Sequence, residues 1–481
     1  MSSRGTRCCP ARRSFRPGSE ACSSDQEALV ASSPKQPDTK ASGRDIFQVA
    51  AVSIAANSIE YYDFFIYGTA AALVFPTLFF PGQSATMGVL LSFATLGVGF
   101  LARPLGGVVF GHFGDIVGRK KTLVIAMMLM GTVSTLIGVL PTYSSIGVAA
   151  PILLVMLRFL QGFSLGGQMG GVVLFAVEKA PASRRGLYGS LTALGSPGGT
   201  LVANGAFIAV TAALSPQALT SWGWRVPFLA SMLLVGLALY LHFRIEETPA
   251  FRRLQEADLA KVAAAASARP TRSPVLTALR TYPREIALTA GTYLGINMTY
   301  YMLIAFVITY GTNPKFLGLP KETLLIAVLI GSTAQFIGLP AAGALSDRVG
   351  RRRVIMAGAG GLAVFSLAFW PMVDSDSFWM IALAMFIAMG LLHSLMYGVQ
   401  PALFAETFST EARYSGVSLG IQFGAVLGGA FAPMIATVLL SKFGSISIGI
   451  YMAVCCLVTL LSVWKLKETS KVESLSELSC A

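Results

Sequence analysis

The chain consists mainly of long apolar stretches at the length that a membrane-spanning helix needs, roughly 20 residues. Twelve such stretches follow one another, and polar segments separate them. They lie at about residues 48–76, 85–110, 122–140, 148–173, 187–213, 225–243, 286–311, 323–345, 354–373, 378–403, 415–440 and 446–464. They are too long for transmembrane β-strands and lack the alternation of such strands. The pattern therefore predicts an all-α polytopic membrane protein with twelve transmembrane helices.

Composition agrees with this class. Hydrophobic residues make up 54% of the chain and charged residues only 12%, whereas soluble domains are about one quarter charged. An ordinary soluble, disordered or disulfide-framework protein is thereby excluded. The six cysteines form no zinc or redox spacing. Cys8 and Cys9 are either free thiols or sites of lipid attachment.

The positive charges divide unequally between the two faces of the predicted bundle. The net charge is +13, and most lysines and arginines fall in the two tails and the even-numbered loops. The opposite face holds Arg225, Lys315, Lys321 and Lys442, while Arg103 and Arg158 lie inside spans. The positive-inside rule then places both termini in the cytoplasm. It also accounts for the net charge without a nucleic-acid partner.

Five segments follow from this topology. They are a disordered cytoplasmic tail (1–45), an N-terminal half (46–243), a cytoplasmic loop (244–285), a C-terminal half (286–466) and a cytoplasmic tail (467–481). The first tail is rich in Arg and Ser, as a transit peptide is, but its acidic residues argue against one. The central loop is basic and Ala-rich, and we expect a short amphipathic helix around Pro249–Ala268.

Two motifs occur once in each half. The first has the form Gly-x3-Asp-x2-Gly-Arg, and the second has the form Glu-x6-Arg. Their members are Gly111, Asp115, Gly118 and Arg119 with Glu178 and Arg185, and Gly343, Asp347, Gly350 and Arg351 with Glu406 and Arg413. The repetition predicts two six-helix pseudo-repeats. Parallel repeats of this kind are a transporter architecture, with a site near mid-membrane between the halves.

The loop motifs also suggest a cytoplasmic gate. The glycines permit close approach of helices, and the acid can accept charge-assisted hydrogen bonds. Arg119 can reach Glu178, and Arg351 can reach Glu406. We expect these pairs to clamp the two halves together on the cytoplasmic side. The alternative is ordinary positive-inside loop charge, although topology requires neither the acid nor the glycines.

These motifs resemble the major facilitator superfamily, and further blocks resemble its metabolite:proton symporter family, above all the shikimate-transporter type. The blocks are Glu60–Phe64, Arg103–Gly107, Arg158–Gly162, Ser221–Phe228, Glu246–Pro249 and Tyr397–Pro401. The resemblance implies proton-coupled uptake of small carboxylates or zwitterions such as shikimate-like acids, 2-oxoglutarate, citrate, proline or betaine. It also implies a monomer in a bacterial-type inner membrane. The chain departs from the family pattern at Tyr61, Ile116 and Gln168, and the last change removes a carboxylate.

Charged groups within spans mark the candidate transport chemistry, because such groups are costly there. Glu60 and Asp63 lie deep in the first span, and Arg158 lies at a similar depth in the fourth. Burial favours a neutral carboxyl group and a nearby cation favours a charged one. We expect Asp63 to pair with Arg158, and its protonation to release Arg158 for an anionic substrate. Glu60 is a second candidate proton carrier. A permanent structural salt bridge is the alternative.

Uncharged groups complete the predicted site. Spans 1, 4, 7 and 10 usually line the cavity in the fold that the chain resembles. The predicted substrate contacts are Arg158, Tyr67, Gln161, Gln168, Asn297, Tyr301 and Gln400. For each uncharged one, an interhelical hydrogen bond is an equal alternative. We expect Arg103 to extend to the membrane interface or pair with an acid there. His393 is either a packing residue or a titrating group.

The sequence carries no enzymatic signature. It lacks a nucleotide-binding loop and a metal constellation. We therefore predict a transporter without a cofactor that uses the proton as its coupling ion. Its direct partners are a small-molecule substrate and the lipid bilayer. Two alternatives remain open. One is an exporter or passive facilitator of the same fold, and the other is a membrane sensor that signals through its tails.

Overall fold

The computed structural model describes residues 43–117, 119–166, 177, 180–246, 274–409 and 412–469. Helices and short connections account for all of these residues, and no strand occurs among them. The all-α class is therefore confirmed. The predicted amphipathic helix at Pro249–Ala268 and the cysteines Cys8 and Cys9 fall outside this part of the chain. All contacts given below lie within the compact unit that begins at Asp45.

The helices of the N-terminal half begin and end close to the predicted spans. In chain order they are α2 (Gly43–Leu73), α3 (Phe75–Phe79), α4 (Ala85–Val117), α5 (Arg119–Val139), α6 (Tyr143–Ile146), α7 (Ala149–Gly166), η1 (Ala182–Arg184), α9 (Arg185–Ala193), α10 (Gly195–Ala213), α11 (Pro216–Ala218), η2 (Leu219–Gly223) and α12 (Arg225–Glu246). Helices α9 and α10 follow each other almost directly and together form the fifth span.

Several spans of the C-terminal half combine α-helix with π-helical turns. The elements are α14 (Pro274–Thr281), α15 (Pro283–Tyr301), η3 (Met302–Phe306), α16 (Val307–Thr312), α17 (Lys321–Val349), α18 (Arg351–Val373), α19 (Phe378–Met385), η4 (Phe386–His393), α20 (Ser394–Tyr397), α21 (Gln400–Thr407), α22 (Arg413–Ala425), η5 (Val426–Ala430), α23 (Ala432–Phe443) and α24 (Ser445–Lys465). Helix α14 lies inside the segment that the sequence predicts as a loop.

Nine helices in the described residues are long and apolar enough to cross a membrane. The three other predicted spans coincide with α2, α5 and α12. The apolar parts of α5 and α12, Val124–Val139 and Arg225–Leu237, are shorter than a full span. The architecture is thus that of a polytopic bundle with a helix at each of the twelve predicted positions.

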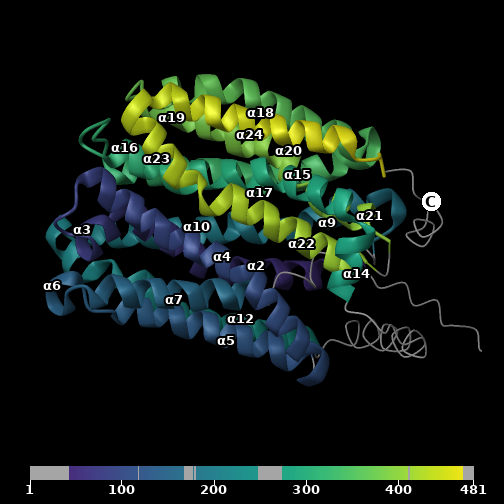
Figure 1. Cartoon of the computed structure of the whole chain (residues 1–481), viewed down its shortest axis with the longest axis horizontal. Coiled ribbons are helices and arrows are strands. Elements are labelled where there is room, and N and C mark those ends of the chain that lie inside the picture. Colours follow the sequence, from purple (N-terminus) through teal and green to yellow (C-terminus); the bar gives the residue numbers. More distant parts are fainter. Residues whose placement is uncertain are drawn as a thin grey trace, which may run out of the picture. The chain divides into compact units, whose positions relative to one another are not determined.

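The same helix pairs pack together in both halves. In the N-terminal half α4 packs against α7, and α5 against α12. In the C-terminal half α17 packs against η4, and α18 against α24; Figure 1 shows α18 and α24 side by side. Between the halves, α4 contacts η5 and α23, while α10 contacts α17. One interface joins the second span to the eleventh, and the other joins the fifth span to the eighth. These two pairs are equivalent positions in the two halves, as two pseudo-repeats require.

Glycines bring α4 and α7 into backbone contact. A Cβ atom added at Gly162 would lie 1.9 Å from the backbone oxygen of Gly99, and one at Gly166 would lie 2.0 Å from that of Arg103. The four-residue spacing of these glycines is the small-xxx-small pattern of tightly packed membrane helices. This packing holds the side chain of Arg158 against Gly99, where an added Cβ would lie 2.7 Å from its Nε.

Candidate functional site

Arg158 lies at the centre of the N-terminal half. Its side chain is fully buried, and its guanidinium carbon lies 4.1 Å from the ring centres of both Phe64 and Tyr67. Nη1 donates a hydrogen bond to the side chain of Gln161. Nε and Nη2 have no hydrogen-bond partner. A buried cation is stabilised only when acceptors or a counter-charge surround it, so Arg158 retains donors for an anion.

Arg103 does not extend to the membrane interface as the sequence predicts. It is buried, with its guanidinium carbon 4.3 Å from the ring centre of Phe64 and 4.2 Å from that of Phe100. Its Nε has no hydrogen-bond partner, and among the described residues no acid forms an ion pair with it. The close α4–α7 contact turns this face of α4 inward, and cation–π attraction then stabilises the charge.

Asp63 does not form the predicted ion pair with Arg158. The carboxyl group of Asp63 is fully buried, and neither oxygen has a hydrogen-bond partner. The hydroxyl groups of Ser134 on α5 and Ser231 on α12 lie beside it. Asp63 thus lies beside α5 and α12, whereas Arg158 faces the aromatic rings of Phe64 and Tyr67. The predicted direct pair is therefore absent from this conformation.

Gln161 stands between these two groups. Its Nε2 donates to the backbone oxygen of Asp63 at 3.0 Å and to the hydroxyl of Ser134 at 2.7 Å. Its Oε1 accepts the hydrogen bond from Arg158. The amide is one helical turn from Arg158 on α7, and it bonds both Arg158 and the backbone of Asp63. Gln161 therefore makes the interhelical bonds that were the alternative to substrate contact.

The remaining predicted site residues differ in whether they lie at the arginine cluster. Tyr67 and Tyr301 join the arginine cluster, because the Tyr67 ring contacts Arg158 and the Tyr301 ring centre lies 5.0 Å from that of Phe100. The Tyr67 hydroxyl also bonds Thr95 at 2.5 Å. Asn297 donates to the backbone oxygen of residue 425 at 3.2 Å. Gln400 is buried at the start of α21, and among the described residues no hydrogen bond joins it to the cluster. Gln168 and the side chain of Glu60 lie outside the described residues.

His393 is fixed by hydrogen bonds in the C-terminal half. Its Nδ1 lies 2.6 Å from Nε2 of Gln335, and its Nε2 lies 2.9 Å from the backbone oxygen of Ile296. The rings of Tyr300 and Tyr397 flank it, with ring centres 5.5 and 5.7 Å away. These contacts match the packing interpretation of this histidine, and the titrating role remains a prediction.

Asp347 joins the two halves on the face that carries the loop motifs. Its two carboxylate oxygens accept the backbone N–H groups of Gly186 and Leu187 at 2.8 and 3.0 Å. These N–H groups belong to the first turn of α9, where the helix dipole favours an anion. A Cβ added at Gly343 would lie 2.5 Å from the backbone oxygen of Gly186. Contact with the N-terminal half thus explains both Asp347 and Gly343 in the C-terminal copy of the loop motif.

The pair of Arg351 and Glu406 is present, but it does not itself join the halves. Two nitrogens of Arg351 lie 3.4 Å from the two carboxylate oxygens of Glu406, and both residues belong to the C-terminal half. Arg351 also bonds Asp347 at 2.6 Å. The arginine therefore orients the Asp347 carboxylate towards α9. This corrects the prediction that the Arg–Glu pair is the clamp, because the interhalf bonds are made by Asp347.

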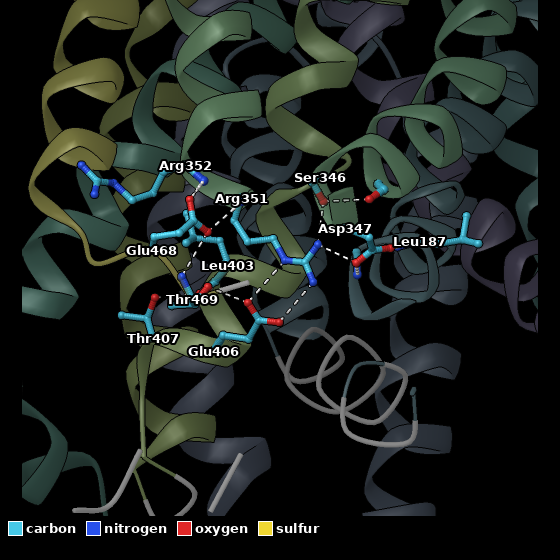
Figure 2. Close-up of polar contacts among 12 residues, drawn as sticks. Leu187, Ser346, Asp347, Arg351, Arg352, Leu403, Glu406, Thr407, Glu468 and Thr469 are labelled. Atoms are coloured by element: carbon cyan, nitrogen blue, oxygen red, sulfur yellow. Dashed lines mark hydrogen bonds and ion pairs between the residues drawn. The ribbon is translucent and has the colours of Figure 1, made fainter. Parts of the chain in front are cut away.

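The segment after the last helix belongs to the same cluster. Glu468 accepts the backbone N–H groups of Arg351 and Arg352 at 2.9 and 3.1 Å, which caps the start of α18. Thr469 donates to Glu406 at 2.6 Å. Figure 2 shows both residues beside Arg351 and Glu406. Gly350 adopts a φ of 109°, a conformation that favours glycine, and an added Cβ would lie 2.9 Å from Glu468.

Sequence reasoning missed Glu468 and Thr469, although a signal existed. The dipeptide Glu-Thr follows the sixth span as Glu247-Thr248 and the twelfth as Glu468-Thr469, so it recurs like the other two motifs. Phe100 was also detectable, since it precedes Arg103 by three residues and shares its helical face.

The structure describes only some residues of the first copy of the motifs. Arg185 and Arg413 are buried at the starts of α9 and α22. Gly111 and Asp115 belong to α4 and Arg119 begins α5. The side chains of Asp115 and Arg119, together with Gly118 and Glu178, lie outside the described residues. The gate role of this copy therefore stays a prediction.

A bundle of two pseudo-repeated helix sets, with a buried charged cluster and an interhalf contact at one end, defines a membrane transporter of the major facilitator fold. Solved structures with this fold include the proton:xylose symporter XylE bound to 6-bromo-6-deoxy-D-glucose (TM-score 0.67, 18% identity, covering 90% of this chain and 98% of that one). An inward-open conformation of XylE from E. coli gives a TM-score of 0.64.

The chain belongs to the sugar (and other) transporter family, whose model matches residues 49–479. Among similar proteins, the inner membrane metabolite transport protein YhjE of Escherichia coli is 38% identical over 88% of this chain and 94% of its own length. The shikimate transporter of the same organism is 38% identical over 87% and 94%. A putative proline/betaine transporter of Staphylococcus aureus is 33% identical over 81% of both chains. The predicted family and the predicted membrane-transporter class are confirmed.

We predict that Asp347→Ala separates the halves on the side of the loop motifs, because it removes both acceptors for the first turn of α9. Spin labels on the exposed residues Ser183 and Arg348 would report this separation. Pulsed electron spin resonance should give a longer distance, or a second longer component, in the variant. Arg353→Ala is the matched control, because it removes an exposed charge of the same motif. Equal shifts in both variants would support the plain loop-charge interpretation instead.

Proposed function

We propose that this protein is a proton-coupled symporter of a small organic carboxylate, working by alternating access. One observation carries the proposal. Two buried arginines, Arg158 and Arg103, share the ring of Phe64 and have no acid in an ion pair with them among the described residues. A buried carboxyl group, Asp63, lies in the same half and has no hydrogen-bond or ion-pair partner among the described residues.

The arginines supply the chemistry for an anionic ligand. A buried cation without a counter-charge is costly. Neither arginine has an acidic partner among the described residues, and a substrate carboxylate would lower this cost. Arginine presents its donors as a fork that matches a carboxylate. The names of the similar transporters agree with this chemistry, because shikimate, proline and betaine each carry a carboxylate. The rings of Phe64, Phe100, Tyr67 and Tyr301 would cover the rest of a compact ligand.

Asp63 supplies the candidate proton site. A carboxylate that is fully buried and receives no hydrogen bond is strongly disfavoured, so the neutral acid suits this conformation. A group of this kind can take up a proton where one side of the membrane is accessible and release it where the other side is. The proton is then the coupling ion, and no further cofactor is required.

Alternating access follows from the contacts between the halves. In this fold, one repeat moves against the other around a central site. The bonds from Asp347 to α9 close the side of the loop motifs, and they must break when that side opens. We assign this side to the cytoplasm, with both termini there, and we take the monomer as the working unit.

We predict net uptake of one carboxylate by purified protein in vesicles with an imposed inward proton gradient. The panel is shikimate, quinate, protocatechuate, 2-oxoglutarate, citrate, proline and betaine. Accumulation above equilibrium that a protonophore abolishes supports symport. Equilibration that ignores the gradient would show a passive facilitator. No movement of any compound by folded protein would refute the substrate class.

We predict that Asp63→Asn abolishes accumulation and leaves exchange of substrate across the membrane. The amide cannot carry a proton, but its size keeps the packing around Ser134 and Ser231. Labelled-substrate counterflow measures exchange, and gradient-driven uptake measures coupling. Full accumulation by Asp63→Asn would remove this residue from the coupling mechanism and leave Glu60 as the remaining candidate.

We predict that Arg158→Lys raises the KM of counterflow roughly 10- to 100-fold, because a hydrogen bond to a charged group contributes about 1.5–3 kcal/mol and each 1.4 kcal/mol is tenfold. Arg103→Lys should act in the same direction. Lysine keeps the charge and loses the planar fork. The control is Arg353→Lys at an exposed position. Unchanged KM values in both buried variants would exclude the arginines as anchors.

A further inference from the structure

A hydrogen bond deep in the bundle joins the two halves at a second place. The hydroxyl groups of Thr200 on α10 and Tyr300 on α15 lie 2.6 Å apart, and both side chains are buried. The Thr200 hydroxyl also donates to the backbone oxygen of Ser196 at 3.2 Å. A hydroxyl group has one hydrogen to donate, so Tyr300 is the donor to Thr200. The bond therefore runs from the C-terminal half to the N-terminal half.

Rings from both halves surround the ring of Tyr300. Its centre lies 5.5 Å from the ring centres of Phe65 on α2 and His393 on η4, and 6.5 Å from that of Tyr397 on α20. These contacts fix the direction in which the hydroxyl group points. Breaking the bond to Thr200 therefore requires α10 to move away from α15.

The bond lies beside the arginine cluster. Tyr301 follows Tyr300 on α15, and its ring centre lies 5.0 Å from that of Phe100 and 6.1 Å from that of Phe64. The rings of Phe64 and Phe100 in turn contact the two buried arginines. A movement that separates Tyr300 from α10 would therefore also withdraw Tyr301 from the cluster.

The fifth span, α9 with α10, carries both contacts between the halves. Gly186 and Leu187 in the first turn of α9 bond Asp347, and Thr200 follows Leu187 by 13 residues. At 1.5 Å per residue, the two contacts lie about 20 Å apart along the span. The packing of α9 and α10 against α17 lies along the same span. One contact at the end of a helix leaves the helix free to tilt, whereas two contacts at this spacing resist tilting as well.

We propose that Thr200 and Tyr300 are positioning residues whose hydrogen bond keeps the arginine cluster closed towards the side of the loop motifs. The halves separate on that side only when this bond and the Asp347 contact are both broken. Water that enters the opened interface then accepts from the Tyr300 hydroxyl, so the net cost of breaking the bond is modest. The inference goes beyond the proposed function, since it needs neither the substrate class nor the coupling ion.

The test is the distance between spin labels on Ser183 and Arg348 in purified protein, measured by pulsed electron spin resonance without substrate. Tyr300→Phe keeps the ring contacts and removes the donor. It should raise the ratio of separated to closed molecules roughly 3- to 15-fold, the range expected for a side-chain hydrogen bond between membrane helices. Thr200→Val should raise this ratio at least as much, because it leaves the Tyr300 hydroxyl buried without its acceptor.

Combined variants identify the bond itself. Tyr300→Phe together with Thr200→Val should separate the halves no further than Thr200→Val alone, because both changes remove one bond. Tyr300→Phe together with Asp347→Ala should multiply the two single effects, because contacts this far apart act independently.

Two variants serve as matched controls. Tyr62→Phe removes a buried tyrosine hydrogen bond to the backbone oxygen of Pro227, and Thr299→Val removes a buried threonine contact to the sulfur of Cys456. Each of these contacts stays within one half, so neither variant should change the distance distribution. Thr200→Ser keeps the hydroxyl group and should match the wild type.

Two results would overturn the inference. One is a wild-type distance distribution in folded Tyr300→Phe and Thr200→Val. The other is an equal shift in Tyr62→Phe or Thr299→Val, which would show a general loss of packing. Either result leaves proton symport standing, because the measurement uses neither a substrate nor a proton gradient. Failure of the uptake assays likewise leaves the Thr200–Tyr300 contact to be judged by its own distances.

Discussion

The burial of the Arg158 guanidinium is the constraint on which the centre of this protein depends. A cation inside a membrane protein must be surrounded by acceptors, aromatic faces or an anion. The chain provides two ring faces and one amide oxygen, and it leaves two donors without partners. The glycine contacts between α4 and α7 make this possible, because they bring Arg158 and the aromatic side chains of α2 and α4 together.

A different kind of interaction joins the halves at the end of the bundle that carries the loop motifs. There the contact between the halves is an anion at a helix N-terminus, with Asp347 accepting from the first turn of α9. Arg351, Glu406 and the segment after α24 orient that anion from one side only. Helix α9 also packs against α17 and α21 at this end. Such a contact suits a protein whose halves must separate without either half losing its structure.

Hydrophobic spacing and charge placement predicted much of the fold, because both follow directly from the cost of exposing polar groups to lipid. The repeated motifs likewise predicted two halves, and the comparisons identify the family. The site was predicted less completely. Arg158, Tyr67 and Tyr301 do meet in one cluster, but the Asp63–Arg158 pair does not form, and Arg103 is buried rather than interfacial. Depth along a span is readable from residue number, whereas the direction in which a side chain points depends on helix rotation.

The sequence by itself determined the class of this protein, its helical spans and the residue types that carry charge into the membrane. Only the tertiary structure decided which of those charges meet. Gln161 bonds Arg158, Ser134 and the backbone of Asp63, and the close Gly99–Gly162 contact fixes the packing of the helix that carries it. Asp347, rather than the Arg351–Glu406 pair, joins the halves. Its partners are backbone N–H groups of α9, and a pattern of side chains in the sequence cannot predict such a contact. Both outcomes depend on helix packing, which joins residues far apart in the chain.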